Sequence, residues 1–165
     1  MIAEREQVIK SLDLGSNDNV LEILTGERNF ISSVFEEIRQ VETIESDPAL
    51  AYSASWKSVQ VKAENHAVFC GHPHVFLQQK VDNGVEVDGV IVHADRLECP
   101  RKVWSMIALL DPLWVILTYK DAGKGKYNKR LMETNGFTIM KQEGDSKNGI
   151  SERFCVGRSN KCYSD

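Results

Sequence analysis

Short apolar runs rich in β-branched residues alternate with longer segments of helical periodicity, and this alternation limits the folds that the chain can adopt. The expected strands cover residues 19–24, 41–45, 58–62, 87–93, 113–119, 137–140 and 153–157. The expected helices cover 3–14, 28–39, a short segment from Pro48, a segment near 72–80, 99–110 and 125–135. Because helices separate the first five strands, the chain can return to the same edge each time, which predicts parallel pairing. We therefore expect an α/β fold with a doubly wound, mostly parallel sheet and helices on both faces.

Several boundaries carry local signals. Asp47 is placed as an N-cap, with Pro48 at the first helical position of the segment that follows. Asn135-Gly136 is typical of a left-handed helix end. The polar segment 142–151 joins the last two strands directly, which is compatible with an antiparallel pair.

Length and composition indicate one globular domain. The chain has 165 residues, and about 150 residues is an ordinary domain size. Hydrophobic residues make up 42% and charged residues 27%, which excludes a mainly disordered chain. We expect a single domain over 1–165, with a core at about 18–158, a leading helix within 1–15 and a polar tail at 159–165.

Charge and cysteine usage limit the partners and the compartment. The formal net charge of -4 gives no general attraction to phosphate backbones, so a small molecule is favoured over nucleic acid, which is not excluded. The charged N-terminus and the lack of an apolar run near 18 residues predict neither a signal peptide nor a membrane span. Four cysteines without CxxC spacing are typical of reduced thiols, which predicts a cytoplasmic protein of undetermined oligomeric state.

The strand ends are where ligands bind in open α/β sheets. Glu45 ends the second expected strand and lies 19 residues after Gly26, which follows the first. An acidic residue at that spacing accepts hydrogen bonds from the two hydroxyls of a ribose, because a carboxylate offers two acceptor oxygens. The alternative is a solvated glutamate at a strand end.

Five segments, in order, resemble the motifs of class I S-adenosylmethionine-dependent methyltransferases. They are Val20–Gly26 (VLEILTG), Val41–Leu50 (VETIESDPAL), Val87–Asp95 (VDGVIVHAD), Asn135–Phe137 (NGF) and Arg153–Arg158 (RFCVGR). The resemblance implies a seven-stranded Rossmann-like sheet whose last strand is antiparallel. It also implies S-adenosylmethionine as cofactor, with S-adenosylhomocysteine as product.

The resemblance also implies roles for particular residues. Cofactor contacts are expected from Glu22, Thr25 and Gly26, from Glu45 and Ser46 beside the ribose, and from Glu64 and Asn65 beside the adenine, with Ala63-Glu64 as the alternative register. An asparagine that caps a turn is the other reading of Asn65.

After the fourth strand, His93 and Asp95 are the candidate catalytic residues. Histidine titrates near neutrality and can take a proton from a hydroxyl or amine acceptor, although a structural hydrogen bond at the strand end is the alternative. In some small-molecule O-methyltransferases an aspartate at the position of Asp95 binds a divalent metal. Only Asp121 offers a further carboxylate after the fifth strand, so no metal site is predicted.

The glycine pattern departs from that of the family. Leu24, Gly26 and Arg28 align with the three glycines that let the backbone approach the cofactor, and only the middle one is kept. Two functions remain. One is a methyltransferase acting on an unidentified, small-molecule acceptor. The other is a non-catalytic, methyltransferase-like binding or partner subunit with weakened or lost cofactor binding. A nicotinamide-dependent enzyme is disfavoured by the glycine pattern.

Two further clusters have alternative interpretations. His66, Cys70, His72 and His74 are zinc-ligand types, but their spacing matches no known finger, and a solvent-facing loop is favoured. A basic cluster follows the fifth strand and fits either an anionic acceptor or, as favoured, a solvated helix face. Its members are Lys120, Lys124, Lys126, Lys129 and Arg130, interleaved with Tyr119 and Tyr127.

Overall fold

A computed structural model describes residues 18–26, 38–144 and 153–160, and within them a seven-stranded sheet has the order β3-β2-β1-β4-β5-β7-β6. The strands are β1 (Asn19–Ile23), β2 (Gln40–Glu45), β3 (His66–Cys70), β4 (Gly89–His93), β5 (Trp114–Tyr119), β6 (Phe137–Gly144) and β7 (Arg153–Ser159). The helices are α2 (Pro48–Gln60), α3 (Pro73–Asp82), the 3-10 turn η2 (Ala94–Arg96), α4 (Pro100–Leu110) and α5 (Ala122–Thr134). The first five strands pair in parallel, and β7 is antiparallel to both β5 and β6, which confirms the expected fold class.

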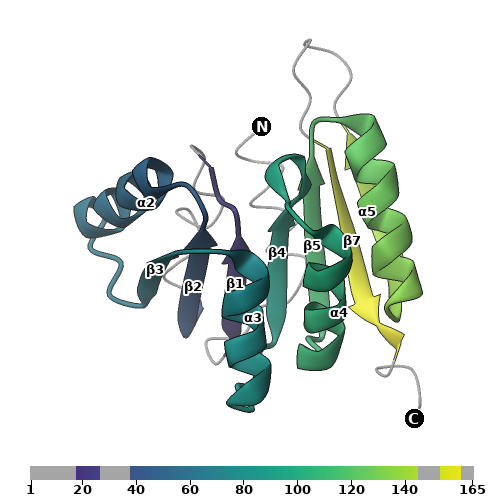
Figure 1. Ribbon diagram of the computed structural model, residues 1–165, viewed down its shortest axis with the longest axis horizontal. Coiled ribbons are helices and arrows are strands. Elements are labelled where there is room, and N and C mark those ends of the chain that lie inside the picture. The colour runs from purple at the N-terminus through teal and green to yellow at the C-terminus, as the bar shows by residue number, and fades with distance from the viewer. Residues whose placement is uncertain (1–17, 27–37, 145–152, 161–165) are drawn as a thin grey trace.

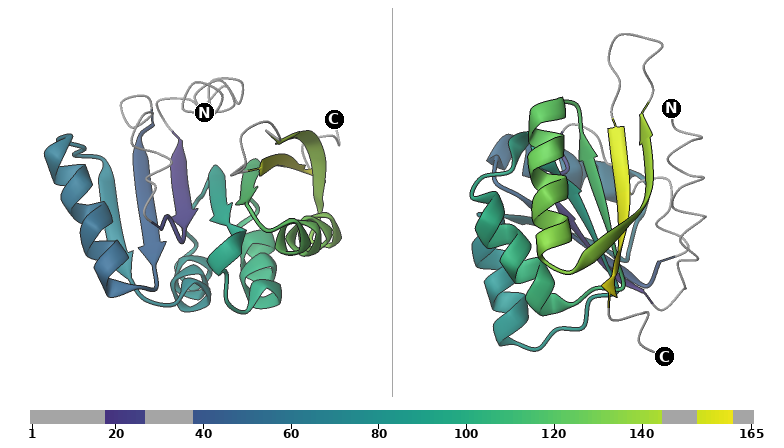
Figure 2. Two further views of the ribbon diagram at one scale, coloured as in Figure 1. Left: turned by 90° about the horizontal axis from the view of Figure 1, so that it is seen from above. Right: turned by 90° about the vertical axis from the view of Figure 1, so that its right-hand side faces the viewer.

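The helices cover the sheet from two sides. Figures 1 and 2 show α3, α4 and α5 side by side on one face, while α2 lies at the β3 edge. Since β1 pairs with β2 on one side and with β4 on the other, the winding direction reverses beside β1. That reversal creates the crevice in which such sheets bind ligands. Across the described residues, every helix is too short or too polar to traverse a lipid bilayer.

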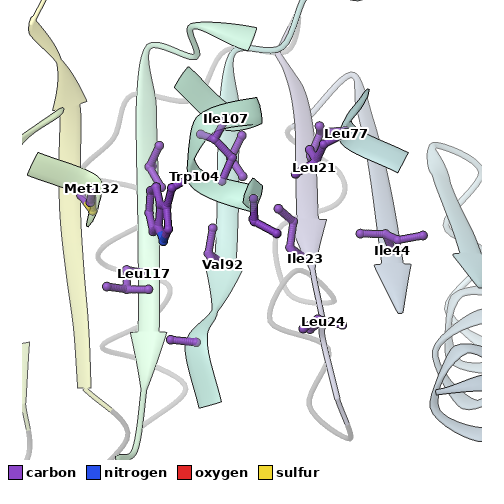
Figure 3. Close-up of a cluster of buried hydrophobic side chains, with 14 of the residues drawn as sticks. Leu21, Ile23, Leu24, Ile44, Leu77, Val92, Trp104, Ile107, Leu117 and Met132 are labelled. Atoms are coloured by element: carbon purple, nitrogen blue, oxygen red, sulfur yellow. The ribbon is translucent and has the colours of Figure 1, made fainter. Parts of the chain in front are cut away.

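Alternating side chains of the strands build the core. The larger cluster lies between the sheet and α3, α4 and α5, and Trp104 of α4 is fully buried within it (Figure 3). The indole Nε1 donates to Asn128 Oδ1 of α5 at 2.8 Å, so this buried polar atom is satisfied. A smaller cluster lies on the opposite face and includes Val20, Val41 and Ile116. Burial on both faces explains the almost continuous apolar sequence of β4 and β5.

One predicted strand is wrong. Residues 58–62 do not form the third strand, because α2 runs for 13 residues from Pro48 to Gln60 and β3 is His66–Cys70. The Asp47 side chain caps α2 by accepting from Ala49 N at 2.8 Å and Leu50 N at 3.3 Å, as expected. The alternating Val59 and Val61 side chains are exposed. Val59 is on the exposed face of the last turn of α2, and Val61 is the residue that ends the helix, so their alternation is not that of a strand.

The other described elements agree with the sequence to within a few residues. The helix near 72–80 is α3, and the expected helix 99–110 is α4. Gly136, just beyond α5, has a φ of 92°, which fits the predicted left-handed helix end. The expected helices 3–14 and 28–39 fall mainly on 1–17 and 27–37, outside the described residues.

A close approach between α5 and β5 depends on Gly125. A Cβ built at this position would lie 2.2 Å from the Tyr119 ring, closer than any real contact. The missing side chain therefore lets the helix backbone pack directly on the aromatic ring. This contact holds α5 beside the carboxyl end of β5, where the candidate site is formed.

Candidate functional site

A cleft of about 560 Å³ lies at the carboxyl ends of β1, β4 and β5. Its volume falls within the range of about 300–1,000 Å³ that is typical of small-molecule sites. The lining residues are Leu24, Thr25, Gly26, Leu50, His93, Asp95, Arg96, Thr118, Lys120, Asp121 and Lys124. The structure thus brings together four of the residues that the sequence singled out: Thr25, Gly26, His93 and Asp95.

Glu45, at the end of β2, is fully buried beside this cleft and every acceptor position of its carboxylate is used. Gly26 N donates to Oε2 and Asp47 N to Oε1, both at 3.0 Å. Arg96 adds a two-pronged ion pair, with Nη1 at 2.8 Å from Oε2 and Nη2 at 2.9 Å from Oε1. Glu45 and Gly26, 19 residues apart, are therefore in direct contact. The Arg96 guanidinium takes up the remaining acceptor positions of the Glu45 carboxylate.

Leu24 shows how the departure from the glycine pattern is accommodated. Its φ is 62°, in the left-handed region that costs a residue with a Cβ about 1–2 kcal/mol. The side chain is buried in the core, and the backbone N–H donates to Ile44 O at 2.8 Å. The loop after β1 thus keeps a backbone conformation suited to glycine and places a leucine side chain there.

His93 is held by protein groups at both ring nitrogens. Nδ1 lies 2.6 Å from Thr118 Oγ1, and Nε2 lies 3.0 Å from Glu22 Oε1. Glu22 is fully buried, is not among the cleft-lining residues, and also accepts from Thr43 Oγ1 at 2.9 Å. Within the cleft, the exchangeable hydroxyl nearest to His93 is therefore that of Thr118.

Asp95 organises the loop between β5 and α5. Its carboxylate accepts from Lys120 N at 2.8 Å and from Asp121 N at 3.0 Å. Asp121 in turn caps α5 by accepting from Lys124 N at 2.8 Å, and the Lys124 ammonium donates to the Asp95 carbonyl oxygen. These bonds hold in place the part of the cleft wall that Asp95, Lys120, Asp121 and Lys124 form.

Comparison with known proteins places this geometry in context. No protein-family model matches the chain, and no curated protein matches its sequence. Solved structures do match its fold. A precorrin-6Y C5,15-methyltransferase from Geobacter metallireducens GS-15 aligns with a TM-score of 0.74 at 9% identity, over 94% of this chain and 87% of that one.

Two further structures align over similar lengths. Magnesium protoporphyrin IX methyltransferase (ChlM) from Synechocystis PCC 6803, solved with bound S-adenosylmethionine, gives a TM-score of 0.68 at 18% identity over 96% and 79% of the two chains. The fibrillarin pre-rRNA processing protein of Methanococcus jannaschii gives 0.65 at 15% identity over 88% and 68%. The chain has the fold of S-adenosylmethionine-dependent methyltransferases. Identities this low show the fold alone.

Five residues expected to contact the cofactor are not among those that line the cleft of this methyltransferase fold. Glu22 and Glu45 are buried near the ends of their strands, and the other three are Ser46, Glu64 and Asn65. Ser46 follows β2 and is partly buried. Glu64 and Asn65 precede β3, so they lie at the amino end of the parallel strands, whereas the cleft is at the carboxyl end. Asn65 Nδ2 donates to Ile38 O at 2.6 Å. The expected role of Glu64 and Asn65 depended on a third strand ending at Lys62, and the structure does not bring these two residues to the cleft.

The histidine and basic clusters lie apart from the cleft, with Lys120 and Lys124 as the exceptions. His66 is in β3 and reaches toward α2, whereas His72 and His74 begin α3 with their rings 5.9 Å apart. No group of three metal-ligating side chains suited to an ion is found within 18–26, 38–144 and 153–160. The α5 cations, including Lys126 and Arg130, line a separate hollow of about 570 Å³.

Sequence reasoning missed two polar cleft residues of this methyltransferase fold. Arg96 directly follows the candidate catalytic residue Asp95, but nothing in the sequence around it indicated an ion pair. Its partner Glu45 is 51 residues away in the chain. Thr118 did carry a signal. It is a polar residue in β5, the most hydrophobic strand, where every position is buried. A hydroxyl in such a strand needs a partner, and His93 provides it.

Proposed function

We propose that the chain is an S-adenosylmethionine-dependent methyltransferase that acts on a small-molecule acceptor in the cleft beside Glu45. The observation that carries this proposal is the buried Glu45 carboxylate, joined to the Gly26 loop at the mouth of a cleft large enough for a small ligand. A structural neighbour with bound S-adenosylmethionine supports the cofactor assignment. When bound, the cofactor supplies an electrophilic methyl group and leaves as S-adenosylhomocysteine.

The residues fit the ribose on one condition. Glu45 offers two oxygens to two hydroxyls only after Arg96 withdraws, because the carboxylate has no spare acceptor position. The Arg96 side chain is 36% exposed and lines the cleft, so rotation toward solvent is open to it. Gly26 N and Asp47 N would remain on the carboxylate and hold it in place. Thr25 and Gly26 would then contact the cofactor beside Leu24.

The acceptor is proposed to be a small molecule, because the net charge of -4 gives no general attraction to nucleic acid. A structural neighbour that processes pre-rRNA, together with the α5 cations, keeps nucleic acid as a second class to be assayed. Among the described residues the cysteines Cys70, Cys99 and Cys155 are free thiols, which is in keeping with the proposed location in the reducing cytoplasm.

A second function is favoured by two specific observations. Arg96 binds both oxygens of Glu45, the carboxylate proposed to bind the ribose. Leu24 lies where close approach of the backbone to the cofactor would need a glycine. Both fit a non-catalytic binding or partner subunit that has lost the cofactor. The two functions differ in whether the cofactor displaces Arg96.

Calorimetric titration of the full chain with S-adenosylmethionine and S-adenosylhomocysteine tests the proposal. We expect micromolar binding that is lost in Glu45→Gln, because the amide offers one acceptor oxygen instead of two. Glu42→Gln is the matched control, since Glu42 is on the same strand but pairs with Lys80. No heat from the wild type or from a variant without Arg96 would contradict the methyltransferase and support the non-catalytic subunit.

A further inference from the structure

Six polar side chains form one continuous chain of hydrogen bonds across the sheet, from the cleft to α2. In spatial order they are Thr118 (β5), His93 (β4), Glu22 (β1), Thr43 (β2), His66 (β3) and Ser58 (α2). They lie on the face of the smaller apolar cluster, since Glu22 alternates in phase with Val20 and Thr43 with Val41. Glu22, Thr43, Ser58 and Thr118 are all buried.

The contacts are short and unbroken. Thr118 Oγ1 lies 2.6 Å from His93 Nδ1, and His93 Nε2 lies 3.0 Å from Glu22 Oε1. On the other side, Thr43 Oγ1 lies 2.9 Å from Glu22 Oε2 and 2.7 Å from His66 Nε2. His66 Nδ1 contacts Ser58 Oγ, which also lies 3.0 Å from Ala54 O. Glu22 is thus the centre of the chain, with one imidazole on each side.

The ionised Glu22 carboxylate sets the direction of the bonds on the cleft side of the chain. His93 Nε2 donates to Glu22 Oε1, so Nδ1 of a neutral imidazole carries no hydrogen and accepts from Thr118 Oγ1. Because an ionised Glu22 only accepts, the hydrogens on both sides must point toward it. Burial lowers the pKa of His66 below 6.5, which supports its neutral form, although the nearby Glu22 charge acts in the opposite direction.

This direction has a chemical consequence at the cleft. Thr118 donates its hydrogen to His93 Nδ1, so the lone pairs of Thr118 Oγ1 are left to accept a hydrogen from a molecule in the cleft. His93 cannot accept one directly, because Nδ1 takes the Thr118 hydrogen and Nε2 carries the hydrogen given to Glu22. Thr118 is therefore the contact between the cleft and the imidazole.

We propose that Thr118 and His93 form a proton relay for a hydroxyl or amine acceptor, with Glu22 as the residue that positions His93. The inference rests on the proposed function for its substrate. The acceptor's O–H or N–H proton moves to Thr118 Oγ1 while the Thr118 O–H proton moves to His93 Nδ1. The electron pair of the broken bond stays on the acceptor, and His93 becomes an imidazolium beside the Glu22 carboxylate. After product leaves, the same path returns the proton to solvent.

The surrounding charges leave Glu22 as the dominant influence on His93. Around the cleft, the Asp95 and Asp121 carboxylates are bound by backbone N–H groups, and Arg96 is paired with Glu45. Lys120 and Lys124 also line the cleft, and the Lys124 ammonium donates to the Asp95 carbonyl oxygen. Glu22 is the charged group in direct contact with His93, and it also acts on His66. Removing its charge should therefore change both rings.

Nuclear magnetic resonance of the ¹⁵N-histidine-labelled full chain tests the relay without any ligand. In the wild type we expect neutral His93 to carry its proton on Nε2, with Nδ1 unprotonated. Thr118→Val should shift the Nδ1 resonance toward that of a nitrogen without a hydrogen bond. Glu22→Gln should shift the His93 Nε2 resonance, because the hydrogen bond from Nε2 then loses its charged acceptor. Thr138→Val, an exposed threonine on β6, is the matched control and should change neither ring.

Two results would overturn the relay. One is a neutral His93 that carries its proton on Nδ1, because Nδ1 would then donate to Thr118 Oγ1 and could not accept its proton. The other is a folded Thr118→Val protein whose His93 resonances equal those of the wild type. These outcomes do not depend on cofactor binding, so they are separate from a failure of the proposed function in calorimetry. Where methyl transfer to a protic acceptor is measured, Thr118→Val should lower kcat about a hundredfold with KM little changed, and an unchanged kcat refutes the relay.

Discussion

Replacing Arg96 by methionine should weaken the folded protein and strengthen cofactor binding at the same time. Arg96 donates two charge-assisted bonds, of 2.8 and 2.9 Å, to a carboxylate that has no exposed surface. The substitution Arg96→Met introduces an unbranched apolar side chain and removes both bonds. Glu45 then keeps only the backbone donors Gly26 N and Asp47 N.

The burial of the two partners sets the size of the effect. Breaking a fully buried ion pair costs about 3–5 kcal/mol, whereas an exposed pair contributes up to about 1 kcal/mol. The Arg96 side chain is 36% exposed and the Glu45 side chain 0%, so an intermediate loss of about 2 kcal/mol is expected. In a domain of this size that loss lowers Tm by about 4–8 °C. In the wild type, a ligand that binds Glu45 must first break the Arg96–Glu45 ion pair. Removing Arg96 should therefore tighten ligand binding at least tenfold, since about 1.4 kcal/mol of binding free energy corresponds to a factor of ten.

Thermal denaturation and calorimetric titration with S-adenosylhomocysteine measure the two effects on the same samples. Arg101→Met is the matched control, because Arg101 is an exposed arginine on α4 that bonds the Tyr127 hydroxyl outside the cleft. It should change neither Tm nor affinity appreciably. If Arg96→Met binds the ligand no more tightly than the wild type does, Arg96 does not compete for Glu45 and the reasoning fails. An unchanged Tm would likewise show that the ion pair adds nothing to the fold.

Three further predictions concern the scaffold. Burial holds the pKa of His66 below 6.5, so in mild acid the unfolded chain binds a proton that the folded chain does not. The free energy of unfolding should therefore decrease as the pH is lowered from about 7 to about 5, and it should decrease less steeply in His66→Gln. Burial raises the pKa of the Cys155 thiol to about 11, so near pH 8 iodoacetamide should label exposed Cys70 and spare Cys155 until unfolding, as read by peptide mass spectrometry. Gly125→Ala should lower stability by about 1–3 kcal/mol in chemical denaturation, because its Cβ would overlap the Tyr119 ring.

The fold was predictable from sequence because its signals are local. Strands β4 and β5 are almost continuously apolar, and the Asp47 cap and Gly136 mark helix ends with their own side-chain or backbone chemistry. The third strand was misplaced because two valines in alternation resemble a strand wherever they lie. Val59 and Val61 are exposed near the end of α2, a position that only the length of the helix decides.

The site was predictable only in part, because its decisive contacts join residues far apart in sequence. Gly26 follows β1 and Glu45 ends the neighbouring strand β2, so the hydrogen bond between them joins two residues that the sequence had already selected by their spacing. The Arg96–Glu45 pair depends on how β4 lies relative to β2, with β1 between them, and no sequence spacing encodes that contact. The same holds for Glu22 and His93, which belong to strands that are neighbours in the sheet but 71 residues apart in the chain.

Arg96 and Leu24 would restrict the proposed cofactor site in physically different ways. Arg96 is attached to Glu45 by side-chain bonds at the surface of the cleft, so a ligand with two adjacent hydroxyls can replace it without disturbing the core. Leu24 is packed among core residues with its backbone N–H bound to Ile44 O, so removing it from the site would require unpacking that part of the sheet. A ligand of this cleft therefore has to displace Arg96 and fit beside Leu24. In the proposed function, the fold sets where the ligand binds, and these two side chains set which ligands of that shape are accepted.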